Sequence, residues 1–150
     1  MPESKRIRLL KLTADQVIND FKHEEDSLGN ITKTFCNMAL DVLCKEVWGF
    51  KGFTGMLANQ IVDRMKNAPD FAEVGPDAAQ NLANDGRMVI AGFKNDPHGH
   101  VSAIYPGTCV YSGKWRCNAP MSVNVGKRNG LMGTNYAYQT PPIYWVWIEG

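Results

Sequence analysis

Two cysteines lie on one predicted helix, and their positions give them different chemistry. The stretch "KTFCNMALDVLCKEV", residues 33–47, places Cys36 near the start of the helix and Cys44 two turns further on. A thiol in the first turn feels the unpaired amide hydrogens and the positive end of the helix dipole, which favour the thiolate. Cys44 falls on or beside the apolar stripe, where burial raises a thiol pKa. Cys36 is therefore the candidate nucleophile, and Cys44 is predicted to be a core residue.

A thiol nucleophile needs a base, and the chain offers few. It has three histidines, and His23 lies on the polar face of the first predicted helix. His100, in "PHGHVSAIY", begins a predicted strand directly after a glycine. From there its ring can reach a helix terminus across a cleft, so His100 is the predicted base. His98 is either a loop residue or, if the strand extends that far, a cleft residue, and it is assigned to substrate binding.

A thiol–imidazole pair also uses a third polar group that holds the ring in the correct tautomer. Asn124 interrupts the apolar strand "MSVNVG", and strand alternation turns it away from the face of its two valine neighbours. An asparagine of a turn or an edge strand is the alternative interpretation. We predict that Asn124 orients His100, ahead of Asn118 and Asn129, which lie in loop-like sequence.

The elements that must position these residues follow from local patterns. Helices are predicted over residues 13–24 with Thr13 as cap, from Thr32 or Thr34 to about Trp48, and over 55–68 and 76–86. Residues 25–30, "EDSLGN", read as a linker. Five short segments rich in β-branched and aromatic residues follow, over 87–93, 100–107, 108–113, 121–126 and 143–148. Helices followed by strands predict an α+β domain with the helices on one side of an antiparallel sheet.

The bulk properties limit the function. With 150 residues, of which 44% are hydrophobic, the chain suits one core, so a single domain over 1–150 is predicted. Sixteen basic and fifteen acidic side chains give no electrostatic footprint for nucleic acid or for a membrane. The first residues, "MPESKRIRLLKL", lack the apolar region of a secretory signal, so synthesis without an export signal is expected.

Four short motifs together resemble a known family. "TFCNMAL", "GHVSAIYPG", "MSVNVGKRNG" and the terminal "PPIYWVW" resemble the CHAP and NlpC-like peptidoglycan hydrolases over roughly residues 30–148. These enzymes belong to the papain-like superfamily with a circularly rearranged core. The resemblance implies a papain-like α+β fold in which Cys36 attacks the amide carbonyl, His100 protonates the leaving amine and Asn124 orients His100. Phe35 departs from the family, which often has Gln or Asp there, so the Cys36 amide is the expected oxyanion donor.

The resemblance also implies a substrate and a setting. The expected activity is that of a cysteine endopeptidase or an N-acetylmuramoyl-L-alanine amidase acting on bacterial peptidoglycan, without a cofactor. Trp115, Tyr136 and Tyr138 are candidates for stacking on sugar rings or crosslink peptides. Action in the periplasm or cell wall is then expected after holin release of a phage endolysin. A secreted antibacterial effector, whose producer needs an immunity protein, is the other expected route.

Three other interpretations stay open. His98 and His100 with Cys109 or Cys117 form a candidate zinc site, although no second paired-ligand motif accompanies them. A cell-wall-binding or interaction module that lost catalysis is a non-enzymatic alternative. A papain-like acyltransferase or deamidase acting on a protein would use the same thiol. Cys109 and Cys117 also flank a Ser-Gly turn and could form a disulfide in an oxidising compartment.

Overall fold

Six antiparallel strands form the central sheet of the computed structural model, which describes residues 3–148. The strand order is β3-β10-β4-β5-β8-β9, and every neighbouring pair is antiparallel. The bounds are Phe71–Val74 for β3, Ile143–Trp147 for β10, Val89–Phe93 for β4, His100–Ile104 for β5, Met121–Asn124 for β8 and Gly130–Gly133 for β9. The predicted α+β class with an antiparallel sheet is confirmed.

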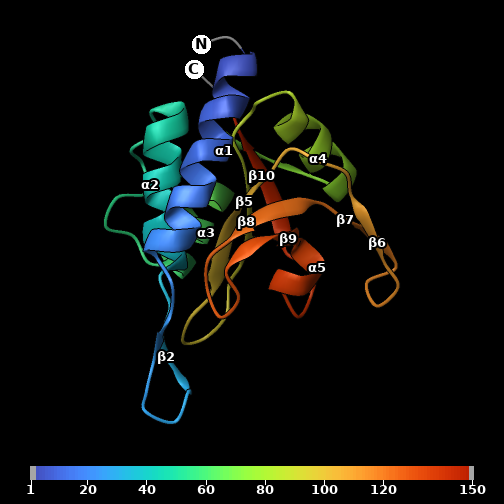
Figure 1. The fold of residues 1–150 in the computed structure, drawn as a ribbon. Coiled ribbons are helices and arrows are strands. Elements are labelled where there is room, and N and C mark those ends of the chain that lie inside the picture. The colour runs from blue at the N-terminus through green and yellow to red at the C-terminus, as the bar shows by residue number, and fades with distance from the viewer. Residues whose placement is uncertain (1–2, 149–150) are drawn as a thin grey trace.

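Helices cover both faces of this sheet (Figure 1). Helices α1 (Glu3–Asp20), α2 (Cys36–Trp48) and α3 (Ala58–Asn67) pack on one face, and α4 (Pro76–Asn84) and α5 (Thr134–Ala137) pack on the other. Strand alternation supplies both faces, because successive side chains point in opposite directions. Ile90 of β4 joins the core under α1–α3, and Ala91 joins the core under α4. The prediction that all helices lie on one side was therefore wrong.

The second helix begins at Cys36 itself, with Phe35 as its N-cap and no side-chain cap. The prediction that a threonine caps this helix was wrong, because Thr32 belongs to a hairpin and its hydroxyl donates to the carbonyl of Glu24 at 3.2 Å. The predicted end at Trp48 is confirmed. Gly49 follows in the left-handed conformation, with φ of 67°, which glycine adopts without steric cost.

The first helix is longer than predicted at its start and shorter at its end. It spans Glu3–Asp20 rather than 13–24, so Thr13 lies inside the helix and is buried. Leu10 and Val17 lie two turns apart and are almost fully buried, which extends the apolar stripe into the charged N-terminal sequence. No helix among residues 3–148 is long and apolar enough to cross a membrane.

Two hairpins stand outside the main sheet. Strands β6 (Val110–Ser112) and β7 (Cys117–Ala119) form one, and β1 (Glu24–Glu25) and β2 (Ile31–Lys33) form the other, which projects from the body of the molecule in Figure 1. The predicted linker 25–30 begins with Glu25 of β1, and its other residues form the turn of the β1–β2 hairpin. The Asp26 carboxylate organises this turn, since it accepts the amides of Leu28 and Asn30 at 2.9 Å each.

Candidate active site

Strands β5 and β8 separate at one end, and the candidate residues gather there. The two strands pair only through Ala103 with Val123 and Ile104 with Ser122. Their ladder therefore stops before His100, the first residue of β5. Helix α2 packs on β5, and in its first turn the Cys36 thiol meets the backbone amide of Val101 in β5. The fold thus brings a helix start, a strand start and a strand end to one place.

His100 and Asn124 bridge the separated strands. The Nε2 atom of His100 lies 2.6 Å from Oδ1 of Asn124, and Nδ2 of Asn124 donates to the Arg128 carbonyl at 2.7 Å. Because the amide nitrogen is used by Arg128, the oxygen must face the ring, and Nε2 is the protonated nitrogen. This tautomer leaves the Nδ1 lone pair available as a base. The predicted pairing of these two residues agrees with the geometry.

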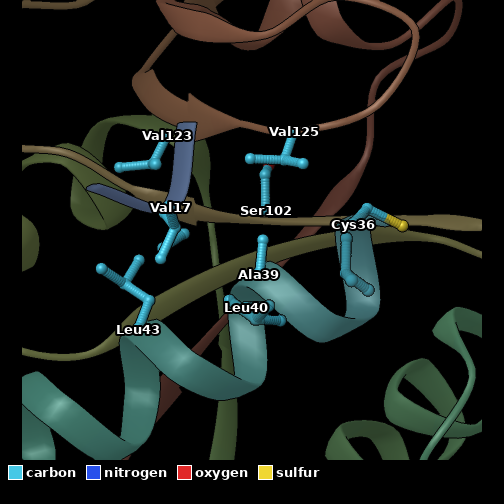
Figure 2. Close-up of a pocket in the computed structure, with 10 residues that line it drawn as sticks. Val17, Cys36, Ala39, Leu40, Leu43, Ser102, Val123 and Val125 are labelled. Atoms are coloured by element: carbon cyan, nitrogen blue, oxygen red, sulfur yellow. The ribbon is translucent and has the colours of Figure 1, made fainter. Parts of the chain in front are cut away.

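Cys36 occupies the first position of α2, with 8% of its surface exposed. Its sulfur points away from the apolar side chains of Val17, Leu43 and Val123 (Figure 2). Burial raises the pKa of the Cys36 thiol, and the backbone amides of Val101, Asn37 and Cys36 itself oppose this only in part. The helix start favours the thiolate, as expected, but the expected net lowering of the pKa was wrong because desolvation is the larger effect.

Burial also lowers the pKa of His100, and the hydrogen bond from the ring to Asn124 opposes this only in part. A raised thiol pKa and a lowered imidazole pKa both favour the neutral forms at pH 7.

Tyr138 is a wall of the same site. Its ring centroid lies 4.9 Å from that of His100. Burial raises the pKa of Tyr138 well above its ordinary value, and a charge on Cys36 adds to this effect. The Tyr138 hydroxyl donates to the Ala91 carbonyl at 3.1 Å and lies 2.9 Å from Oγ of Ser102. Since Tyr138 is buried, it cannot stack on a sugar, and that prediction was wrong.

Two glycines allow close packing around His100. A Cβ on Gly99 would lie 2.5 Å from the Phe93 carbonyl oxygen and would also collide with the side chain of Asn59. A Cβ on Gly126 would lie 3.0 Å from Cε1 of His100. Such contacts are too close for a methyl group to be added without movement. The glycine before His100 in the sequence is therefore required by packing.

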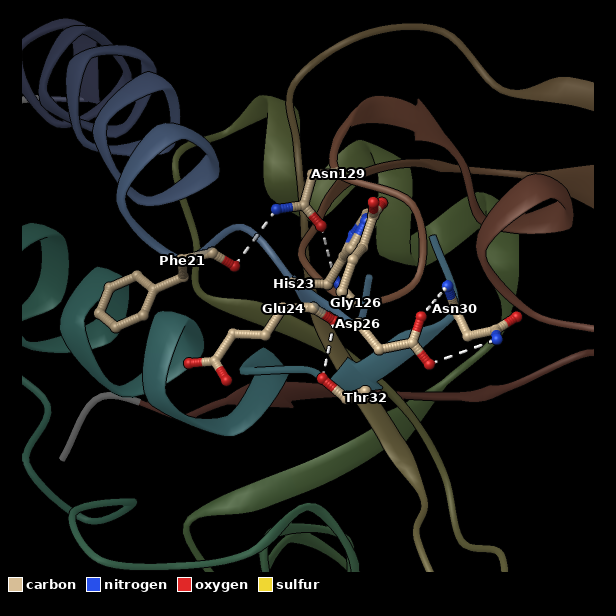
Figure 3. A network of polar contacts seen from close by, with 9 residues as sticks. Phe21, His23, Glu24, Asp26, Asn30, Thr32, Gly126 and Asn129 are labelled. Atoms are coloured by element: carbon tan, nitrogen blue, oxygen red, sulfur yellow. Dashed lines mark hydrogen bonds and ion pairs between the residues drawn. The ribbon is translucent and has the colours of Figure 1, made fainter. Parts of the chain in front are cut away.

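The loop that carries Gly126 is tied to the end of α1 (Figure 3). Asn129 accepts the Gly126 amide at 3.0 Å and donates from Nδ2 to the carbonyls of Phe21 at 3.2 Å and Ile18 at 3.3 Å. Asn129, the weaker triad candidate of the sequence, therefore positions the loop beside His100. No sequence signal identifies this role, because its partners lie more than 100 residues away.

A groove of about 540 Å³ opens at the start of α2. Its lining comes from residues 31–38, 57–60 and 97–99 and from Lys127, and it includes both Cys36 and His98. His98 lies in the loop before β5, because the strand begins at His100. Trp115 packs against the core under α4, and Tyr136 is an exposed residue of α5; neither is among the groove residues. Of the predicted substrate-binding residues, only His98 lines the groove beside Cys36.

The second cavity bordered by Cys36 is too small for a ligand. It has a volume of about 10 Å³ and lies between α1, α2, β5 and β8, lined mostly by apolar core side chains (Figure 2). This is roughly the space of a single water. Cys36 thus separates a packed core from an open groove.

The other cysteines and the zinc alternative gain no support from the geometry. Cys44 is fully buried, as predicted. Cys109 and Cys117 are free thiols at the β6–β7 hairpin, where Cys117 pairs with Ser112 across the ladder. Within residues 3–148 no group of three or more His, Cys, Asp or Glu side chains could hold a metal ion.

No family model matches this chain, and no curated protein gives a significant match.

Proposed function

We propose that this protein is a papain-like cysteine hydrolase that cleaves amide bonds of bacterial peptidoglycan, with Cys36 as nucleophile, His100 as base and Asn124 as the residue that orients His100. The main support is the 2.6 Å contact between Nε2 of His100 and Oδ1 of Asn124 at the place where Cys36 begins α2. A helix start, a strand-borne imidazole and a fixed tautomer are the parts that thiol acyl transfer needs.

The chemical steps follow from the protonation states. The Cys36 sulfur bonds to the scissile carbonyl carbon as its proton passes to Nδ1 of His100. The amide C–N bond then breaks, and His100 returns that proton to the leaving amine. Water, deprotonated by His100, hydrolyses the thioester and restores the thiol. The uncapped first-turn amides of α2, including that of Cys36, are the donors available to the oxyanion.

Peptidoglycan as substrate is supported by the resemblance of "TFCN", "GHVSAIYPG" and "MSVNVG" to the CHAP and NlpC-like hydrolases. The groove beside Cys36 is also large enough, since about 300–1,000 Å³ is usual for a ligand site. The activity is then that of an endopeptidase or an amidase, delivered to the wall as an endolysin or as an effector with its immunity protein.

Digestion of purified peptidoglycan, followed by mass analysis of the fragments, tests the proposal. Wild-type protein should release fragments with a new amino terminus within the stem for an endopeptidase, or sugar freed from L-alanine for an amidase. The Cys36→Ala and His100→Ala variants should release none. Binding without digestion by the wild type would indicate the inactive module instead. Transfer of the acyl group to an added amine would indicate the acyltransferase.

A further inference from the structure

The groove beside Cys36 has a strong bias in charge. Its lining contains Lys33 and Lys127 and no aspartate or glutamate. The two lysines are exposed and come from separate segments, Lys33 from the β1–β2 hairpin and Lys127 from the loop after β8. Two cations without an acid in the lining favour an anionic ligand.

The acidic side chains of the hairpin lie outside the groove lining. The Glu25 carboxylate lies 2.9 Å from Nε2 of His23, and the Asp26 carboxylate accepts the amides of its own turn. Glu24 lies opposite Lys33 in the β1–β2 ladder and is exposed, but it is not among the groove residues. The Lys33 ammonium lies 5.2 Å from the centroid of the Phe35 ring, which also lines the groove.

Both lysines are held by structure around them. Lys127 follows Gly126, whose amide is fixed by Asn129 against the end of α1 (Figure 3). Lys33 lies on β2, only three residues before Cys36. A ligand group between these lysines is therefore near the nucleophile.

Strand β2, which lines the groove, also offers backbone groups to an extended peptide. Among the described strands, β2 pairs with β1 alone, so its second edge has free N–H and C=O groups. Residues 31–34 line the groove, whereas β1 does not. An extended peptide can pair with such an edge, as in strand addition. Exposed Met38 and Leu57 add apolar surface for its side chains.

We propose that this groove binds the substrate as an extended peptide and selects those with a free carboxylate near the scissile amide, through Lys33 and Lys127. The inference rests on the proposed function and adds its substrate class. A peptide with a carboxamide in place of that carboxylate is then a poorer ligand, because it carries no charge for the lysines. Lys33 and Lys127 determine specificity and take no part in the chemistry.

The test uses a matched pair of probes and a variant that cannot turn them over. The stem tripeptide L-alanyl-γ-D-glutamyl-L-lysine and its twin with an α-carboxamide on the glutamyl residue are titrated into Cys36→Ala protein by calorimetry. The carboxylate peptide should bind about fivefold more tightly, as expected for solvent-accessible ion pairs. The difference should shrink in concentrated salt.

Lysine variants show whether the preference comes from this groove. Adding Lys33→Gln and Lys127→Gln to the Cys36→Ala protein should remove the preference. Lys114→Gln, in the turn of the β6–β7 hairpin away from the groove, should keep it. Equal affinity for the two peptides, no binding of either, or a preference that survives both groove substitutions would overturn the inference.

The outcomes separate this inference from the proposed function. Cys36-dependent digestion of peptidoglycan together with equal binding of the two peptides would overturn the charge selection alone. A lysine-dependent preference together with no digestion would overturn the hydrolase and support the binding groove.

Discussion

The Nε2 atom of His100 lies 2.6 Å from Oδ1 of Asn124, although 24 residues separate them in the chain. The contact bridges strands β5 and β8 beyond the end of their ladder. It fixes which ring nitrogen carries the proton, and it leaves the Nδ1 lone pair free. The proposed chemistry depends on this arrangement.

Asn124→Ala should lower kcat by about 10²-fold, less than the loss in Cys36→Ala, because it removes ring orientation and leaves the reacting groups in place. Asn124→Asp, which keeps an acceptor for Nε2–H but loses the donor to the Arg128 carbonyl, should recover only part of the activity. Asn118→Ala is the control, since its amide bonds Asp77 elsewhere. Kinetics on soluble peptidoglycan fragments measure the effect, and thermal unfolding checks the fold. Full activity in Asn124→Ala would remove Asn124 from the site.

Alkylation by iodoacetamide should label Cys36 faster than Cys44, because Cys44 is fully buried in the core. The Cys36 rate should keep rising as the pH approaches and passes 9, since burial raises the thiol pKa above its ordinary value of 9.0. Trypsin cleavage after Lys33 and Lys45 gives one peptide with both cysteines, so fragment spectra compare them directly. A Cys36 rate that levels off near neutral pH would show a preformed thiolate and contradict the neutral pair.

Hydrolysis should fall on the acid side with a midpoint below pH 6.5. His100 must be neutral to act as base, and burial lowers its pKa from that value, so activity disappears only as the pH falls through the lowered pKa. The Asn124 hydrogen bond raises this pKa, so Asn124→Ala should move the midpoint to still lower pH. The dependence of kcat/KM on pH measures both. A wild-type midpoint above 6.5 would contradict the assignment.

Gly126→Ala should lower kcat by roughly tenfold or more, because the added methyl would lie 3.0 Å from Cε1 of His100 and displace the ring. Gly113→Ala is a matched control, since its Cβ would meet nothing within 4 Å. Steady-state kinetics of the two variants provide the comparison. Equal activities would show that the ring tolerates the contact.

Local patterns predicted much of this site. The apolar rhythm of α2 gave its end at Trp48, and alternation in "MSVNVG" placed Asn124 on the face opposite its valine neighbours. His100 as the first residue of a strand followed from the glycine and the apolar run beside it. Each of these patterns depends only on residues close together in the chain, so it can be recognised in a single sequence.

Other features depend on contacts between distant segments. Burial raises the pKa of Cys36, and this effect outweighs the local effect of the helix start. The position of α4 on the second face of the sheet, and the bond of Asn129 to Phe21, depend on how the chain crosses over. Hydrophobic periodicity shows that a face is buried, but it does not show which element covers it.

Trapping of the acyl-enzyme is the most direct measurement. Wild-type protein is mixed with soluble peptidoglycan fragments, quenched in acid and cleaved with trypsin. Peptide 34–45 should then have the mass of the acyl group on Cys36 and none on Cys44. Substituting Cys36 by alanine should abolish both the adduct and the digestion. Digestion that persists without the Cys36 thiol, or an acyl group found on another residue, would contradict the account.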